Sequence, residues 1–167
     1  MSKPFVAIVM GSDSDLPVME ASFDVLRAFG VAFEVRITSA HRTPEATKAF
    51  IQDAEQRGCA VFIAAAGMAA HLAGAVAATT VKPVIGVPMN AALDGLDALL
   101  STVQMPAGIP VATVAIGKAG AKNAAYLAVQ ILSLADARLA QQLQDERAAN
   151  AEDVYARNAA LQEKLKG

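Results

Sequence analysis

Five short runs rich in β-forming residues recur along the chain, and most of them are apolar almost throughout. They cover residues 5–10, 31–37, 60–66, 83–88 and 109–116. Continuous apolarity, as opposed to strict alternation, is typical of strands that are covered on both faces. The pattern therefore predicts five strands of a parallel sheet with helices on each side.

The segments between these runs have helical spacing and recognisable ends. Val18, Val25 and Phe29 share one face of the first such segment. Helix starts are expected at Asp15 with Pro17 and at Thr43 with Pro44, and helix ends or the loops after them at Gly30, Gly58 and Gly108. Alternating strands and helices with right-handed crossovers predict an α/β three-layer αβα sandwich, flavodoxin-like or Rossmann-like, with strand order 2-1-3-4-5.

The last third of the chain reads as one long helix. From about Asn123, strong helix formers continue without proline or glycine until Gly167. We expect a single domain over residues 1–167, whose part after about Asp136 forms a C-terminal helical extension packing on a neighbouring subunit. A solvated helical tail is the alternative.

Composition narrows the class of partner. Hydrophobic residues make up 54% of the chain and charged residues only 18%, which favours a homo-oligomer. No apolar run is long enough for a membrane span, and a net charge of −2 without a basic cluster argues against nucleic acid. The start does not resemble a signal peptide, and the single cysteine, Cys59, is expected in the core, so a cytoplasmic location is predicted.

Candidate chemistry gathers in the loops that follow the predicted strands, where open parallel sheets bind ligands. The first loop, GSDSD, has no P-loop or dinucleotide motif. Its Ser12 and Ser14 hydroxyls could hold one phosphate, and Asp15 could accept hydrogen bonds from ribose hydroxyls. These residues suit a nucleoside monophosphate, although Asp15 could instead simply cap the first helix.

Both histidines of the chain fall in these loops. Ser39, His41 and Arg42 follow the second strand and supply a hydroxyl, a group that exchanges protons near neutral pH, and a guanidinium for a phosphate. His71 follows the third strand among small residues that permit close approach of a ligand. Each could also be an ordinary loop histidine. No spacing typical of a zinc site occurs, and no aromatic residue in these loops could stack a flavin.

Five ordered motifs between residues 5 and 136 give the chain a family resemblance. They are VAIVMGSDSD, SAHRTP, AAGMAAHLAG, PVIGVP and QMPAGIPVATVAIGKAGAKNAA. The chain resembles the aminoimidazole ribonucleotide carboxylase family of purine biosynthesis, and within it the class I branch, the N5-carboxyaminoimidazole ribonucleotide mutases. The resemblance implies a ribonucleotide monophosphate substrate, an octamer, and neither metal nor ATP as cofactor.

The resemblance also implies roles for individual residues. His41 matches the general acid and base. Asp15 would bind the ribose hydroxyls, and Arg42 with Ser12 and Ser14 would hold the phosphate. The remaining expected substrate contacts line a pocket for the carboxylate or carbon dioxide, and they are Ser39, Gly67, Ala69, His71 and Leu72. The loop GKAGAKN is expected to help close the site.

The implied reaction is loss of carbon dioxide from the substrate nitrogen, trapping of the gas, and recarboxylation at ring carbon 4, with His41 giving and then taking one proton. Two other functions stay open. A class II carboxylase would use free carbon dioxide, but that class tends to carry AHK and to lack the second histidine, whereas this chain has Arg42 and His71. A non-catalytic nucleotide-sensing module would not need His41. Met68 departs from the family pattern and would narrow the pocket or fill a gap.

Overall fold

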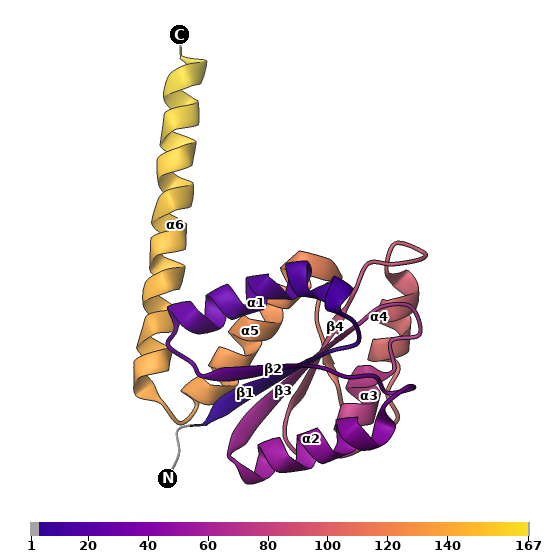
Figure 1. The fold of residues 1–167 in the computed structure, drawn as a ribbon. Coiled ribbons are helices and arrows are strands. Elements are labelled where there is room, and N and C mark those ends of the chain that lie inside the picture. The colour runs from indigo at the N-terminus through magenta and orange to yellow at the C-terminus, as the bar shows by residue number, and fades with distance from the viewer. Residues whose placement is uncertain (1–3, 167) are drawn as a thin grey trace.

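The computed structural model describes residues 4–166, so residues 1–3 and 167, the ends of the predicted domain, lie outside it. Its centre is a five-stranded parallel sheet in the order β2-β1-β3-β4-β5, which confirms the predicted fold class and strand order (Figure 1). The strands are β1 (Phe5–Met10), β2 (Phe33–Ile37), β3 (Cys59–Ala66), β4 (Val84–Pro88) and β5 (Ala112–Thr113).

Helices cover both faces of the sheet. One face is covered by α1 (Leu16–Ala28) and α5 (Gly117–Ser133), and the other by α2 (Pro44–Gln56), α3 (Leu72–Ala77) and α4 (Leu96–Val103). Alternate residues of β1 enter different cores: Ile8 packs on the first face and Val9 on the second. Both are completely buried, which explains why the strand is apolar at every position.

Two predicted elements differ from the structure. The predicted strand over residues 109–116 shrinks to Ala112–Thr113, because it lies at the edge of the sheet and Pro110 has no N–H for the ladder. The predicted long helix is two helices, α5 and α6 (Ala137–Leu165). The break comes at Asp136, whose carboxylate accepts from the backbone N–H groups of Arg138 and Leu139 and so begins a new helix.

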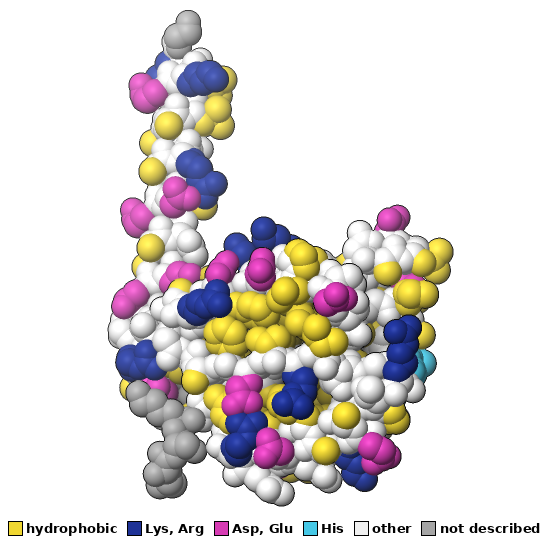
Figure 2. Space-filling model, in the orientation of Figure 1, with side chains coloured by type: hydrophobic (Ala, Val, Ile, Leu, Met, Phe, Trp, Pro, Cys, Tyr) yellow, Lys and Arg dark blue, Asp and Glu magenta, His cyan; other side chains and the backbone are white. Residues whose placement is uncertain are grey.

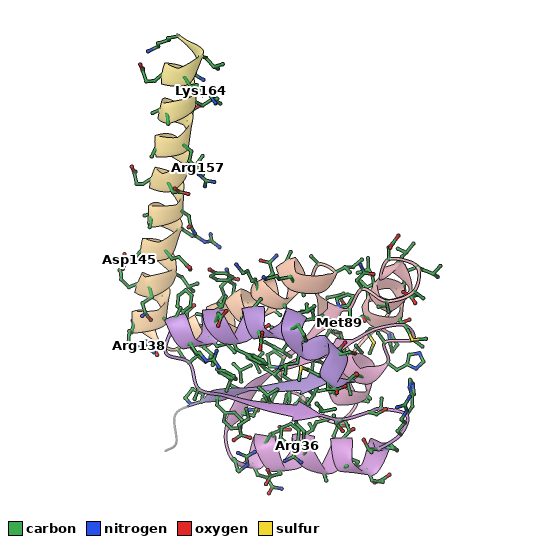
Figure 3. All side chains as sticks on the ribbon, turned by 45° about the horizontal axis from the view of Figure 1, so that its top comes forward. Arg36, Met89, Arg138, Asp145, Arg157 and Lys164 are labelled. Atoms are coloured by element: carbon green, nitrogen blue, oxygen red, sulfur yellow. The ribbon has the colours of Figure 1, made fainter. Side chains whose placement is uncertain are left out.

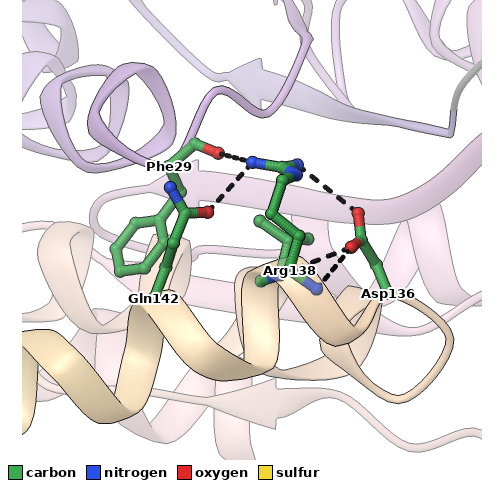
Figure 4. A network of polar contacts seen from close by, with 5 residues as sticks. Phe29, Asp136, Arg138 and Gln142 are labelled. Carbon is green, nitrogen blue, oxygen red and sulfur yellow. Dashed lines mark hydrogen bonds and ion pairs between the residues drawn. The ribbon is translucent and has the colours of Figure 1, made fainter.

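Arg138 fixes the base of α6 against the body. Its guanidinium donates to the carbonyl oxygen of Phe29 at the end of α1 at 3.1 Å, to Gln142 at 2.9 Å and to Asp136 at 3.4 Å (Figure 4). A cation at the carboxyl end of α1 also suits the helix dipole. About two turns further along α6, Glu146 accepts from the Tyr126 hydroxyl of α5 at 2.6 Å, so a second polar contact holds α6 against the body.

Beyond this base, α6 stands away from the body (Figures 1 and 3). Every residue from 147 to 166 is exposed, including Val154, Leu161 and Leu165. Packing of this segment on a neighbouring subunit stays a prediction. Within residues 4–166, no helix is both long and apolar enough to cross a membrane. Cys59 is buried in the core, as expected.

Candidate active site

A cavity of about 640 Å³ lies at the carboxyl edge of the sheet, bounded by the loops that follow β1, β2, β3 and β4. Figure 2 shows histidine at the side of the body opposite α6. The structure brings all ten residues that were predicted for the site to the wall of this one cavity: Ser12, Ser14, Asp15, Ser39, His41, Arg42, Gly67, Ala69, His71 and Leu72. These ten residues come from three separate loops, those after β1, β2 and β3, and face a common space.

The loop after β1 is a short 3-10 turn capped by serine. The Ser12 hydroxyl oxygen accepts from the Ser14 backbone N–H at 3.2 Å and from the Ser14 hydroxyl at 2.9 Å. Asp15 occupies the position before α1, but its side chain makes no capping hydrogen bond. Partial burial raises the pKa of Asp15 above its usual value, although a backbone hydrogen bond from Ser12 opposes this. The capping alternative is therefore wrong for this carboxylate, which lines the cavity instead.

The loop after β2 is organised around Ser39. The Ser39 hydroxyl oxygen accepts from the backbone N–H groups of His41 at 3.3 Å and of Arg42 at 3.1 Å. This turn places the imidazole and the guanidinium at adjacent positions, both exposed at the cavity wall. The Arg42 guanidinium makes no hydrogen bond or ion pair among those of residues 4–166, which leaves its donors available to an anion.

The two histidines contact each other. His41 Nε2 lies 2.8 Å from His71 Nδ1, and the rings are nearly perpendicular at 85°. One nitrogen must donate and the other accept, so the contact couples the tautomers of the two rings. If His41 Nε2 carries the shared proton, His41 Nδ1 is a base; if His71 supplies it, His41 Nδ1 carries a proton. Protonation of both rings would set two donors against each other.

The loop after β3 forms the small-residue wall. A Cβ on Gly67 would lie 3.3 Å from Ala91 Cβ, so glycine lets the loops after β3 and β4 approach closely here. Met68 adopts a left-handed φ of 56° and is 61% exposed, so it lines the cavity and fills no gap in the core. His71 precedes α3, and Leu72, the first residue of α3, is buried and also lines the cavity.

Sequence reasoning missed part of the wall, most notably Asn90. It lies beside Met89 and Ala91 in the loop after β4, and of the predicted closing loop only Gly117 reaches the cavity. Asn90 is the first polar residue after a buried strand, which is the signal that could have identified it. The other unpredicted lining residues are Gly11, Val18, Ala40 and Ala66.

The cavity combines one carboxylate, one guanidinium, several hydroxyls and a pair of imidazoles with a wall of alanine and glycine. Such a set can bind a small anion that carries hydroxyl groups and can exchange a proton with it. Within residues 4–166, no three His, Cys, Asp or Glu side chains are placed to hold a metal ion together.

Comparisons with known proteins show the family to which the chain belongs. The family model described as AIR carboxylase matches residues 5–153. An N5-carboxyaminoimidazole ribonucleotide mutase from Methanocaldococcus jannaschii is 51% identical over 161 residues, which are 96% of this chain and 99% of the relative. The protein of that name from Escherichia coli K12 is 53% identical over 150 residues, 89% of each chain.

Two further comparisons extend the range of relatives. A phosphoribosylaminoimidazole carboxylase from Saccharomyces cerevisiae is 58% identical over 137 residues, which are 81% of this chain and 24% of the relative. The crystal structure of Treponema denticola PurE superposes with a TM-score of 0.84 at 32% identity, over 92% of this chain and 96% of that chain. With a family model that matches most of its length and relatives more than half identical to it, the chain belongs to the AIR carboxylase family.

Proposed function

We propose that this enzyme interconverts N5-carboxyaminoimidazole ribonucleotide and 4-carboxyaminoimidazole ribonucleotide in purine biosynthesis, with His41 as general acid and base. The relatives that match nearly the whole chain are named as mutases of this substrate. The observation that carries the role of His41 is its position in the cavity wall, with one ring nitrogen 2.8 Å from His71 and the other available for a substrate proton.

The nucleotide would lie across the loops after β1 and β2. Arg42 offers a charged, forked donor for the phosphate, and Ser12 and Ser14 add hydroxyls beside it. Asp15 would accept from the ribose hydroxyls, because its carboxylate faces the cavity and is not used as a helix cap. This orientation of the nucleotide directs its aminoimidazole ring toward His41.

The proposed reaction then proceeds in two balanced steps. In the first, the bond between the exocyclic nitrogen and the carboxyl carbon breaks, carbon dioxide is released, and His41 gives its proton to that nitrogen. In the second, ring carbon 4 forms a bond to carbon dioxide, and His41 removes the proton from that carbon. The histidine ends in the state in which it began, so one group serves both steps. The two steps balance in atoms and charge without ATP, a redox partner or a metal.

The part of the cavity that holds carbon dioxide must exclude water. Ala66, Gly67, Ala69 and Leu72 provide an apolar surface next to His71, and Ser39 offers a hydroxyl from the opposite loop. Water excluded from this region cannot carry carbon dioxide away before carbon 4 attacks it. We assign this wall to the carboxylate and carbon dioxide.

Self-association belongs to the same proposal. Leu96, Leu100 and Val103 form an exposed stripe on α4, and Figure 2 shows apolar side chains gathered over α1 and the edge strand β2. Exposed apolar surface of this extent is typical of subunit interfaces. We propose a homo-oligomer, in the form of an octamer, located in the cytoplasm. Residues 1–167 would act as one catalytic domain, and residues 136–167 would pack on a neighbouring subunit.

An interconversion assay tests the proposed function. Purified protein, free of ATP and treated with chelator, is mixed with 4-carboxyaminoimidazole ribonucleotide while the absorbance of that compound is followed. Rapid equilibration with N5-carboxyaminoimidazole ribonucleotide, without dependence on added carbon dioxide, is expected. Exchange only with aminoimidazole ribonucleotide and free carbon dioxide would instead assign the class II activity. Binding of 4-carboxyaminoimidazole ribonucleotide without any reaction would instead favour the non-catalytic nucleotide-sensing module.

A further inference from the structure

Three threonine hydroxyls meet beneath the loop that carries His41. Thr38 and Thr47 are 6% and 3% exposed, and their Oγ1 atoms lie 2.5 Å apart. Thr43 Oγ1 lies 3.3 Å from that of Thr38, and Thr47 Oγ1 donates to the Thr43 carbonyl oxygen at 3.0 Å. Buried hydroxyls such as those of Thr38 and Thr47 are costly unless each has a partner.

Each hydroxyl has one proton, and this limits how the cluster can be arranged. When Thr47 donates to the Thr43 carbonyl, the short contact requires Thr38 to donate to Thr47. Thr43 is then left to donate to the Ser39 carbonyl oxygen at 3.2 Å. All three protons have acceptors in this arrangement, and the Ser39 carbonyl oxygen at 3.4 Å is a second acceptor for Thr47, so the cluster forms one connected network.

The network holds the backbone of Ser39 on both sides. Thr43 Oγ1 accepts from the Ser39 N–H at 3.0 Å, while the Ser39 carbonyl accepts from the Thr43 N–H at 3.0 Å. This explains why Thr43 begins α2 without a side-chain cap: its hydroxyl turns back to Ser39. Ser39 in turn holds the backbone N–H of His41 through its own hydroxyl.

The network also joins the loop to the rigid part of the fold. The Thr38 N–H donates to the carbonyl oxygen of Met10, the last residue of β1, at 2.9 Å, and Thr47 lies within α2. Residues 41–46 are all exposed, so burial of apolar side chains contributes little to their position. Backbone hydrogen bonds and the three hydroxyls therefore together connect the sheet to the histidine loop.

We propose that Thr38 and Thr47 are positioning residues, whose buried hydroxyl contact holds His41 at hydrogen-bonding distance from His71 and in reach of the substrate. This rests on the proposed function, because it concerns the placement of the same general acid and base. A small displacement of the His41 imidazole would weaken its hydrogen bond to His71. It would also misalign the ring nitrogen with the substrate atoms that exchange the proton.

Thr47→Val tests the proposal, because it keeps the shape of the side chain and removes the hydroxyl. We expect kcat to fall about ten-fold or more while KM changes little. Thr47→Ser, which restores the hydroxyl, should recover most of kcat. The matched control is Thr102→Val: Thr102 is equally buried at 3% and donates to a helix carbonyl at 2.7 Å, but it does not line the cavity.

Wild-type kcat in folded Thr47→Val would overturn the proposal, as would an equal loss of kcat in Thr102→Val or a failure of Thr47→Ser to recover it. If Thr47→Val is unfolded at the assay temperature, Thr38→Val removes the other end of the contact and is judged by the same criteria.

A second readout does not depend on turnover. The chain has only two histidines, so their ring nitrogen signals are readily assigned by NMR. Thr47→Val should shift the ring signals of His41 and His71, whereas Thr102→Val should not, and unchanged signals would overturn the positioning role. Lack of turnover in the wild-type protein would instead contradict the proposed function. The NMR signals would then still test whether Thr38 and Thr47 position His41.

Discussion

His41 and His71 lie 30 residues apart in the chain, yet His41 Nε2 contacts His71 Nδ1 at 2.8 Å. His41 follows β2 and His71 follows β3, and these strands are separated in the sheet by β1. The contact therefore spans the loops of two strands that do not pair with each other. It couples the group proposed for proton transfer to the wall proposed for carbon dioxide.

Removing the His71 ring, and with it the nitrogen that contacts His41, should impair catalysis more than substrate binding. For His71→Leu we expect kcat to fall about ten-fold or more, because His41 loses the partner that orients its ring and selects its tautomer. The dissociation constant for 4-carboxyaminoimidazole ribonucleotide, measured by calorimetry, should change much less. His71→Gln keeps a hydrogen-bonding group and should lose less of kcat. Wild-type kcat in His71→Leu would show that the contact is dispensable.

Arg42→Ala should weaken binding of any phosphorylated ligand. Loss of a charge-assisted hydrogen bond to an anion predicts a dissociation constant about ten-fold higher or more. The matched control is Arg36→Ala, since Arg36 is exposed on β2 and its guanidinium lies over the Phe50 ring, outside the cavity. Equal dissociation constants for Arg42→Ala and the wild type would remove Arg42 from the phosphate site.

Asp15→Asn should stabilise the free protein while weakening substrate binding. Burial raises the pKa of Asp15, so the folded state binds the proton more tightly than the unfolded chain does. The resulting stability is present at low pH and is lost as the pH rises through the folded pKa. At pH 7 the ionised carboxylate therefore costs stability, which asparagine avoids.

The measurement for Asp15→Asn is Tm by calorimetry at pH 7 and at lower pH. We expect a higher Tm than wild type at pH 7 and a difference that shrinks as the pH approaches the usual aspartate range. Glu20→Gln, an equal charge change at an exposed position of α1, should leave Tm nearly unchanged. A lower Tm for Asp15→Asn at pH 7 would contradict the cost assigned to burial.

Self-association should depend on the exposed end of α6. Val154, Leu161 and Leu165 recur at helical spacing and so share one face. Replacing all three with serine should lower the sedimentation coefficient while the helical circular dichroism signal is kept. Glu152→Ser with Glu163→Ser, on the opposite face, is the control. An unchanged sedimentation coefficient in the triple variant would argue against packing of α6 on a neighbouring subunit.

The sequence predicted a parallel sheet and the edge at which the cavity lies because both follow from local patterns, whereas the strand order was predicted from the likeness to flavodoxin-like folds. Strands buried on both faces are apolar throughout, and the loops after them share one edge of a parallel sheet. That was enough to bring Asp15, Arg42 and His71 to one cavity. The end of α5 was missed because the helix-forming composition continues across the break, where only Asp136 marks a new start.

Contacts between distant residues could not be predicted in this way. The ring contact of His41 with His71 depends on how far each loop extends from its strand, which no spacing in the sequence records. The buried contact of Thr38 with Thr47 was missed because threonines near a helix start are ordinarily read as caps. Asn90 was overlooked because a single polar residue after β4 matched no motif.

The most direct test of the account is to compare His41→Asn with the wild type in the interconversion assay and in a binding titration. Asparagine keeps hydrogen-bonding capacity but cannot give and take a proton near neutral pH. We expect the wild type to equilibrate the two ribonucleotides, and His41→Asn to bind 4-carboxyaminoimidazole ribonucleotide with nearly unchanged affinity and to show no interconversion. Interconversion by His41→Asn at the wild-type rate would contradict the account.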